Sequence, residues 1–108
     1  MGQDAKQIGH VVMWKLNGKD EAEKKAQGHI IVSAFEQIKA TVEGLIRLDV
    51  GVNIISASDA WDVALYMVFA NREALQLYLG HPSHHEIKKM VGPMRSDRAQ
   101  ADFEIDFS

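Results

Sequence analysis

The sequence contains no cysteine, only two prolines and no long apolar run. Without cysteine, the chain forms neither disulfides nor thiolate metal sites. No apolar stretch approaches the roughly 20 residues that a membrane-spanning helix requires. The amino-terminal MGQDAKQ lacks the apolar stretch of a signal peptide, and Lys6 breaks the pattern for myristoylation. We therefore expect a cytoplasmic protein with no membrane partner.

An excess of positive charge is also absent. The 12 Lys and Arg residues are outnumbered by 15 Asp and Glu, which gives a formal net charge of −3 at pH 7. Nucleic-acid binding depends on clustered basic side chains, so we expect no nucleic-acid partner. A length of 108 residues suits one domain, over residues 1–108, with a modest core.

The spacing of apolar residues predicts four strands and two helices, the second of them broken. Alternating or β-branched runs indicate strands, and apolar residues at helical spacing indicate helices. The predicted order is a strand at 8–16, a helix at 21–42, strands at 45–55 and 62–70, helices at 72–79 and 83–91, and a strand at 101–107.

This β-α-β-β-α-β order predicts a ferredoxin-like α+β fold, in which both helices cover one face of a four-stranded antiparallel sheet. The predicted strand at 62–70 is apolar on both faces, with Ala64, Tyr66 and Val68 opposite the remaining apolar residues. A strand that is apolar on both sides is expected to be covered on both sides. The sequence therefore predicts a homodimer, in which a second copy covers the bare face.

One short stretch concentrates the titratable chemistry. YLGHPSHHE, residues 78–86, holds three of the five histidines, one of two tyrosines and one of two prolines. Gly80 ends one predicted helix, and Pro82 suits the first position of the next. We expect this break to aim two helices at one pocket, with Tyr78 ending the first and His84 opening the second.

Four segments carry a family resemblance: GHVVMWKL, GLIRLDVGVN, DVALYMVFANREALQLYLGHPSHHEI and the closing EIDF. With them the chain resembles the stress-responsive A/B barrel (Dabb) domain family over nearly its whole length. The resemblance implies a homodimer whose two sheets form one α/β barrel with the helices outside. Most members have no assigned reaction. One plant member, olivetolic acid cyclase, closes a polyketide ring by aldol chemistry without a metal or organic cofactor.

Carried over by position, the resemblance implies catalytic roles for Tyr78 and His84. It implies that Asp106 holds this histidine and that His10 lines the pocket from the first strand. One position departs: the cyclase has a further pocket histidine where this chain has Val63. The acid/base groups are thus expected to persist while the substrate differs.

Each candidate has a chemical role and a plainer alternative. His84 is suited to moving protons near neutral pH, with Asp106 within hydrogen-bond reach at about 2.6–3.2 Å, or it bonds only the backbone at a helix start. Asp106 is otherwise a solvated carboxylate at a strand end. Tyr78 steadies a developing enolate oxygen, or it is a packing aromatic. His10 and His81 are candidates for substrate binding, or respectively a satisfied core residue and a helix cap.

No metal or cofactor is expected. His84, His85 and Glu86 are helical neighbours whose side chains point apart, and no histidine pair has a spacing known for zinc. No glycine-rich phosphate loop follows a strand, so neither a nucleotide nor a flavin is expected.

Three functional interpretations remain open. The first is a cofactor-independent enzyme that transfers protons on a small, largely apolar carbonyl compound, as a cyclase, isomerase or lyase does. The second is a non-catalytic dimeric barrel that binds a small ligand or contributes to stress tolerance. The third, and weakest, is a monooxygenase of the dimeric-barrel type. A cavity into which Tyr78 and His84 both point would favour the first, and a packed region would favour the second.

Overall fold

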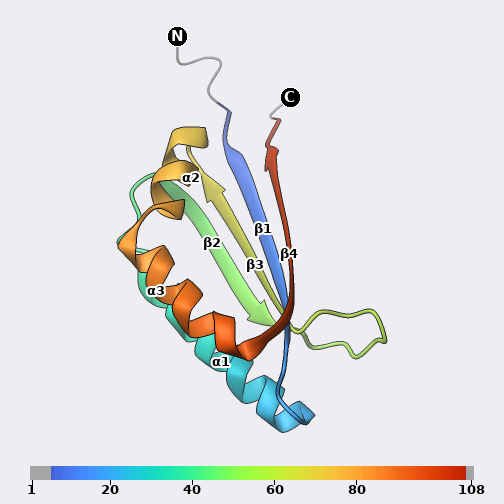
Figure 1. Ribbon diagram of the computed structural model, residues 1–108. Helices are drawn as coiled ribbons and strands as arrows, with labels where there is room; N and C mark the ends of the chain where they lie inside the picture. Colours follow the sequence, from blue (N-terminus) through green and yellow to red (C-terminus); the bar gives the residue numbers. More distant parts are fainter. Residues whose placement is uncertain (1–5, 107–108) are drawn as a thin grey trace.

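The computed structural model of the chain describes residues 6–106, which form one antiparallel sheet and one layer of helices. Figure 1 shows their arrangement. The elements are β1 (Ile8–Leu16), α1 (Glu21–Ile38), β2 (Leu45–Val52), β3 (Val63–Phe69), α2 (Arg72–Leu79), α3 (Pro82–Val91), the 3-10 turn η2 (Gly92–Met94) and β4 (Arg95–Glu104). The strand order is β2-β3-β1-β4, with every neighbouring pair antiparallel. This is the predicted ferredoxin-like α+β fold, with its second helix split in two.

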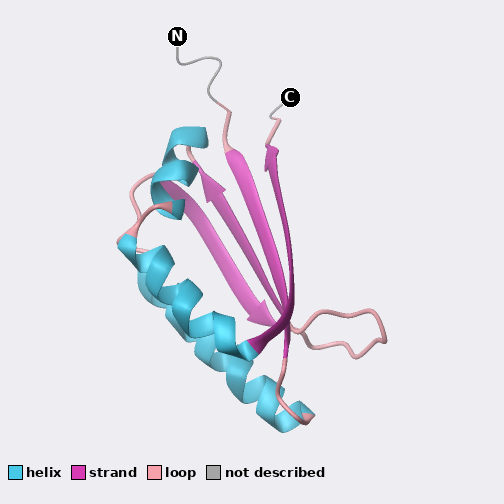
Figure 2. Cartoon of the chain, in the orientation of Figure 1, coloured by secondary structure: helices cyan, strands magenta, loops and turns pink. Residues whose placement is uncertain are grey.

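All three α-helices lie on the same face of the sheet (Figure 2). The core fills the space between these layers, where Val12 and Trp14 of β1 and Leu65 and Met67 of β3 meet Phe35 of α1. One face of β1 points into this core, because His10, Val12, Trp14 and Leu16 are all buried. None of the described helices has the length and apolar character needed to cross a bilayer.

The first helix begins as predicted but ends early. Asp20 caps it by accepting a hydrogen bond from the backbone N–H of Glu23 at 2.8 Å. The prediction that it extends to residue 42 is wrong, because α1 ends at Ile38, whose carbonyl accepts a bond from the hydroxyl of Thr41 at 3.0 Å. Threonine commonly competes with the backbone in this way. Gly44 then takes a positive φ of 82°, which allows the chain to turn into β2.

The strands β2 and β3 also stop short of their predicted ends. β2 pairs with β3 only as far as Val52 opposite Val63, so the apolar alternation that continues to residue 55 has no partner strand. Residues 53–62 form a loop that extends away from the helices in Figure 1. Ile54 and Ile55 at its start are 92% and 72% exposed.

The last strand is displaced towards the amino terminus from its predicted place. β4 runs from Arg95 to Glu104 rather than over 101–107; Ile105 and Asp106 lie beyond it, and residue 107 lies outside the described residues. Its first half, RSDRAQ, has no apolar alternation because it is an edge strand whose helix-side residues are polar. Backbone pairing with β1 defines this strand, and the pattern of apolar residues in β4 does not reveal that pairing.

The face of the sheet away from the helices is bare in the single chain. On β3 it carries exposed Ala64 and half-buried Tyr66, and on β1 half-buried Val11 and Met13. Phe103 of β4, 47% exposed, packs over Gly9, where the ring leaves no room for a side chain. The predicted strand with apolar residues on both faces is therefore present, and its outer face is partly exposed.

Candidate active site

A cavity of about 420 Å³ lies between the helix layer and the inner face of β1, β3 and β4. Its wall combines apolar side chains with titratable and hydrogen-bonding groups. The apolar lining comprises Val12, Trp14, Phe35, Leu65, Leu79, Ile87 and Val91. The polar lining comprises His10, Tyr78, His84, Lys88, Arg95, Arg98 and Gln100.

The break between α2 and α3 brings Tyr78 and His84 together, as the sequence predicts. Tyr78 lies in the last turn of α2 and His84 in the first turn of α3, and their ring centroids are 4.8 Å apart, edge to face. Both line the cavity. His81, a predicted substrate-binding residue, instead caps α3, since its Nδ1 accepts a hydrogen bond from the backbone N–H of Ser83 at 3.0 Å. His81 does not line the cavity, and the helix cap was the plainer alternative for it, so a contact with substrate stays a prediction.

The ring of His84 is oriented by the backbone of the preceding helix. Its Nδ1 lies 3.0 Å from the carbonyl oxygen of Leu79. A carbonyl oxygen only accepts, so Nδ1 carries the proton and Nε2 of the neutral ring holds a lone pair. Burial lowers the pKa of His84 from its ordinary value, and the bond to Leu79 opposes this only in part. The imidazole is therefore mostly neutral at pH 7 and able to accept a proton.

The predicted contact between His84 and Asp106 is wrong. Asp106 follows the end of β4, and its carboxylate pairs with Lys6 at 3.5 Å while remaining 81% exposed. It is a solvated carboxylate near the chain end, as the plainer alternative held. The physical reason is the displacement of β4, which carries residue 106 past the cavity and out of the sheet.

A carboxylate does hold an imidazole in this cavity, but the pair is His10 and Asp102. The pairing of β1 with β4 sets these residues opposite each other, and Nδ1 of His10 hydrogen-bonds Oδ1 of Asp102. The amide of Gln100 donates to the other carboxylate oxygen at 2.8 Å. Burial alone would raise the pKa of Asp102, but the hydrogen bonds from His10 and Gln100 outweigh it and the pKa is lowered. Asp102 is thus an ionised orienting group for a buried histidine.

Tyr78 lies between the two imidazoles. Its side chain is 2% exposed, and its ring centroid lies 4.8 Å from that of His84 and 6.4 Å from that of His10. Burial raises the pKa of Tyr78 well above its ordinary value, although the charge of Arg98 opposes the shift. The hydroxyl therefore stays protonated at neutral pH and is available as a hydrogen-bond donor.

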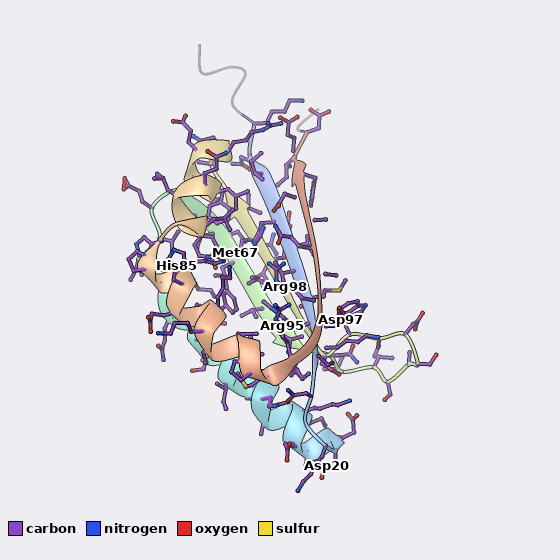
Figure 3. All side chains as sticks on the ribbon, in the orientation of Figure 1. Asp20, Met67, His85, Arg95, Asp97 and Arg98 are labelled. Atoms are coloured by element: carbon purple, nitrogen blue, oxygen red, sulfur yellow. The ribbon has the colours of Figure 1, made fainter. Side chains whose placement is uncertain are left out.

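Sequence reasoning missed the polar side chains that β4 contributes. Arg95 and Arg98 lie towards α3 and the helix side of the sheet, whereas Asp97 points the other way (Figure 3). A period of two counted back from Asp102 through Gln100 to Arg98 was the available signal, because alternate residues of a strand share one face. The predicted strand, which begins at residue 101, leaves out Gln100 and Arg98 and so hides this period.

The described residues include no cluster of three or more His, Asp or Glu side chains placed to hold a metal ion. The cavity groups themselves offer acid/base and hydrogen-bonding chemistry. Two imidazoles, one protonated phenol and an ionised carboxylate can together move a proton and stabilise a developing oxyanion.

The sequence profile of the stress-responsive A/B barrel domain matches residues 8–105. The chain belongs to the stress-responsive A/B barrel family. An uncharacterized protein of Streptomyces coelicolor is 34% identical over 80 residues, which cover 71% of this chain and 78% of that protein. The resemblance predicted from the sequence is thereby confirmed.

Solved structures of the same fold include dimers and an enzyme. A dimeric protein of unknown function with a ferredoxin-like fold from Bacteroides fragilis has a TM-score of 0.81 at 27% identity, over 92% of this chain and 96% of its own. A hydroxynitrile lyase from Passiflora edulis has a TM-score of 0.77 at 12% identity, over 96% and 97% of the two chains. At that identity, the likeness to the lyase concerns the fold alone.

Proposed function

We propose that this member of the stress-responsive A/B barrel family is a cofactor-independent enzyme that moves a proton at the carbon next to a carbonyl group. Its substrate would be a small, largely apolar compound. The observation that carries the proposal is the convergence of Tyr78, His84 and the His10–Asp102 pair on one cavity. These groups come from four elements, and packing alone would not require so much titratable chemistry at one cavity wall.

In the proposed reaction, Nε2 of His84 takes a proton from the carbon beside the carbonyl. The C–H bond breaks, and its electron pair moves onto the carbonyl oxygen. The hydroxyl of Tyr78 donates a hydrogen bond to that oxygen and stabilises its charge. The proton returns to carbon from His84 or from His10, whose positive charge Asp102 would stabilise. Ring closure, isomerisation or cleavage would then depend on the substrate.

We further propose that the protein is a homodimer in which a second copy covers the bare face of the sheet. The partly exposed Val11, Met13, Tyr66 and Phe103 on that face support this proposal. So does the dimeric protein from Bacteroides fragilis, to which the chain is similar over most of both lengths. The cavity lies on the opposite side of the sheet, under the helices, so the dimer would leave its groups in place.

Hydrogen–deuterium exchange tests the proton transfer without knowledge of the natural substrate. Heptan-2-one in D₂O would be followed by proton NMR, with loss of the signals beside the carbonyl as the readout. The wild-type protein should accelerate exchange, and His84→Ala should slow it by about 10²–10⁴-fold. His85→Ala is the matched control, since His85 is exposed, does not line the cavity, and should exchange at the wild-type rate.

A wild-type protein that binds heptan-2-one without accelerating exchange would contradict the proposed reaction. The cavity would then serve as a binding site, as in the alternative of a non-catalytic barrel. Equal losses in His84→Ala and His85→Ala would also contradict it, because only one of these rings lines the cavity.

A further inference from the structure

An irregularity in the pairing of β1 with β4 re-aims one side chain. Trp14 lies opposite Arg98, whereas Leu16, two residues on, lies opposite Arg95, three residues back. The extra residue, Ser96, makes a β-bulge. Residues three apart on a regular strand point to opposite faces, but the bulge puts both arginines on the cavity side. Both line the cavity, and Figure 3 shows them together on the helix side of β4.

Neither cavity arginine has an ion-pair partner among residues 6–106. The two arginines outside the cavity do: Arg47 binds the carboxylate of Asp49 at 2.6 Å, and Arg72 that of Glu104 at 3.2 Å. In the part of the chain that the structure describes, no carboxylate pairs with Arg95 or Arg98. The bulge therefore gathers two guanidinium groups at a cavity wall, where no carboxylate of residues 6–106 forms an ion pair with them.

The carboxylate nearest to this pair is already engaged. Asp102 is hydrogen-bonded by both His10 and Gln100. Burial lowers the pKa of Arg98 and the neighbouring charge of Arg95 lowers it further, whereas the charge of Asp102 opposes the shift only in part. The guanidinium remains charged at any physiological pH. Lys88 of α3 adds a third positive group to the lining. Arg95 and Arg98 thus place two neighbouring positive charges on the β4 side of the cavity, where an anion could bind both.

We infer that the substrate is a small organic acid, whose carboxylate binds Arg98 and Arg95 while its carbonyl group lies at Tyr78. The planar guanidinium matches a carboxylate with two parallel hydrogen bonds. Trp14, which lies opposite Arg98, is four residues along β1 from His10, a distance of roughly 13 Å. The arginine side chains shorten the distance between the carboxylate site and the carbonyl site. Apolar Val12 lines the stretch between them. The substrate would therefore carry a short aliphatic chain between its two polar groups.

This inference rests on the proposed function and deepens it by naming the substrate class. The test compares 6-oxoheptanoate with its neutral amide, 6-oxoheptanamide, which has the same shape and the same ketone. Binding to the wild-type protein would be measured by NMR titration, and exchange beside the ketone by the D₂O assay. The acid should bind about 10- to 100-fold more tightly than the amide, the range expected for charge-assisted hydrogen bonds.

Arg98→Gln should reduce the preference for the acid to about twofold or less, and Arg98→Lys should retain part of it because the charge remains. Arg72→Gln removes the same charge outside the cavity and should keep the wild-type preference. The inference is overturned if wild-type protein binds acid and amide equally, or if Arg72→Gln loses as much preference as Arg98→Gln. Should Arg98→Gln fail to fold, the wild-type ratio alone decides.

The two proposals fail in different ways. If heptan-2-one, the acid and the amide all exchange, and the acid and the amide bind with equal affinity, proton transfer is supported and the carboxylate site is excluded. Preferential binding of the acid without exchange would keep the carboxylate site and remove the catalysis.

Discussion

The two imidazoles of the cavity differ in the group that holds each ring. His84 donates Nδ1–H to a neutral carbonyl, that of Leu79, and burial lowers its pKa. His10 is held by an ionised carboxylate, that of Asp102, which fixes the orientation of the ring. The cavity therefore holds two oriented imidazoles, one bonded to a neutral group and one to a charged group. The orienting pair expected at His84 and Asp106 is thus formed by other residues.

At this scale, we predict that Asp102→Asn slows exchange of heptan-2-one by about 10²-fold. The amide keeps the size of the side chain but no longer stabilises a charged His10, and it can bind the wrong tautomer. Asp106→Asn is the matched control, because Asp106 is solvated and distant from the cavity, and it should leave the rate unchanged. Comparable rates for the two variants would remove Asp102 from the mechanism.

The pH dependence of the wild-type rate follows from His84. The reactive form is the neutral ring, and burial lowers the pKa of His84 below its ordinary 6.5. The exchange rate should rise with pH through an inflection below 6.5 and be level at neutral pH. The folded state binds this proton less tightly than the unfolded chain, so stability should be full above 6.5 and fall as pH drops towards the lowered pKa. A rate that rises only above pH 7 would exclude His84 as the base.

The sequence predicted a helix or strand where one face of that element is buried. It did not predict the ends of most of these elements. The strand 8–16 and the broken helix around Gly80 were located correctly, because apolar spacing and helix-ending residues act locally. β4 was misplaced because its cavity side is polar and its other neighbour is solvent, so only its pairing with β1 identifies it. Tyr78 and His84 were found together from the break. Asp102 and Arg98 share a period of two that a strand beginning at residue 101 leaves out, whereas Arg95 required the bulge, which only the folded sheet supplies.

The connection from α1 to β2 offers a stability test at this scale. Gly44 has a φ of +82°, and a side chain there would lie 2.5 Å from Cβ of Ala74. Gly44→Ala should therefore lower the free energy of unfolding by about 1–3 kcal/mol, through backbone strain and crowding. Gly80→Ala is the control, since Gly80 has a φ of −94° and its nearest neighbour is 3.8 Å away. Denaturant unfolding should show Gly80→Ala within about 1 kcal/mol of wild type.

The whole molecule has two layers and one bare sheet face, which a second copy would cover (Figure 1). A stable interface there should bury more than roughly 1,200 Å² in total. The residues that line the cavity come from the helix layer and the helix-facing side of the sheet, away from the bare face.

Light scattering at micromolar concentration should give the mass of a dimer. Ala64→Arg should shift it to a monomer, because Ala64 is exposed in the single chain on a central strand of the bare face, and an arginine there would disrupt a packed interface. Ala26→Arg, at an exposed alanine of α1, should remain dimeric. A wild-type protein that scatters as a stable monomer would contradict the proposed assembly.

The most direct test of the account is whether Tyr78 and His84 act as one catalytic unit. Exchange of heptan-2-one would be measured for Tyr78→Phe, His84→Ala and the double variant, with circular dichroism to confirm folding. Groups that share one transition state give non-additive losses. The account predicts that the double variant is about as slow as the slower single variant. Losses that multiply would mean independent roles, and single variants as fast as wild type would contradict the site altogether.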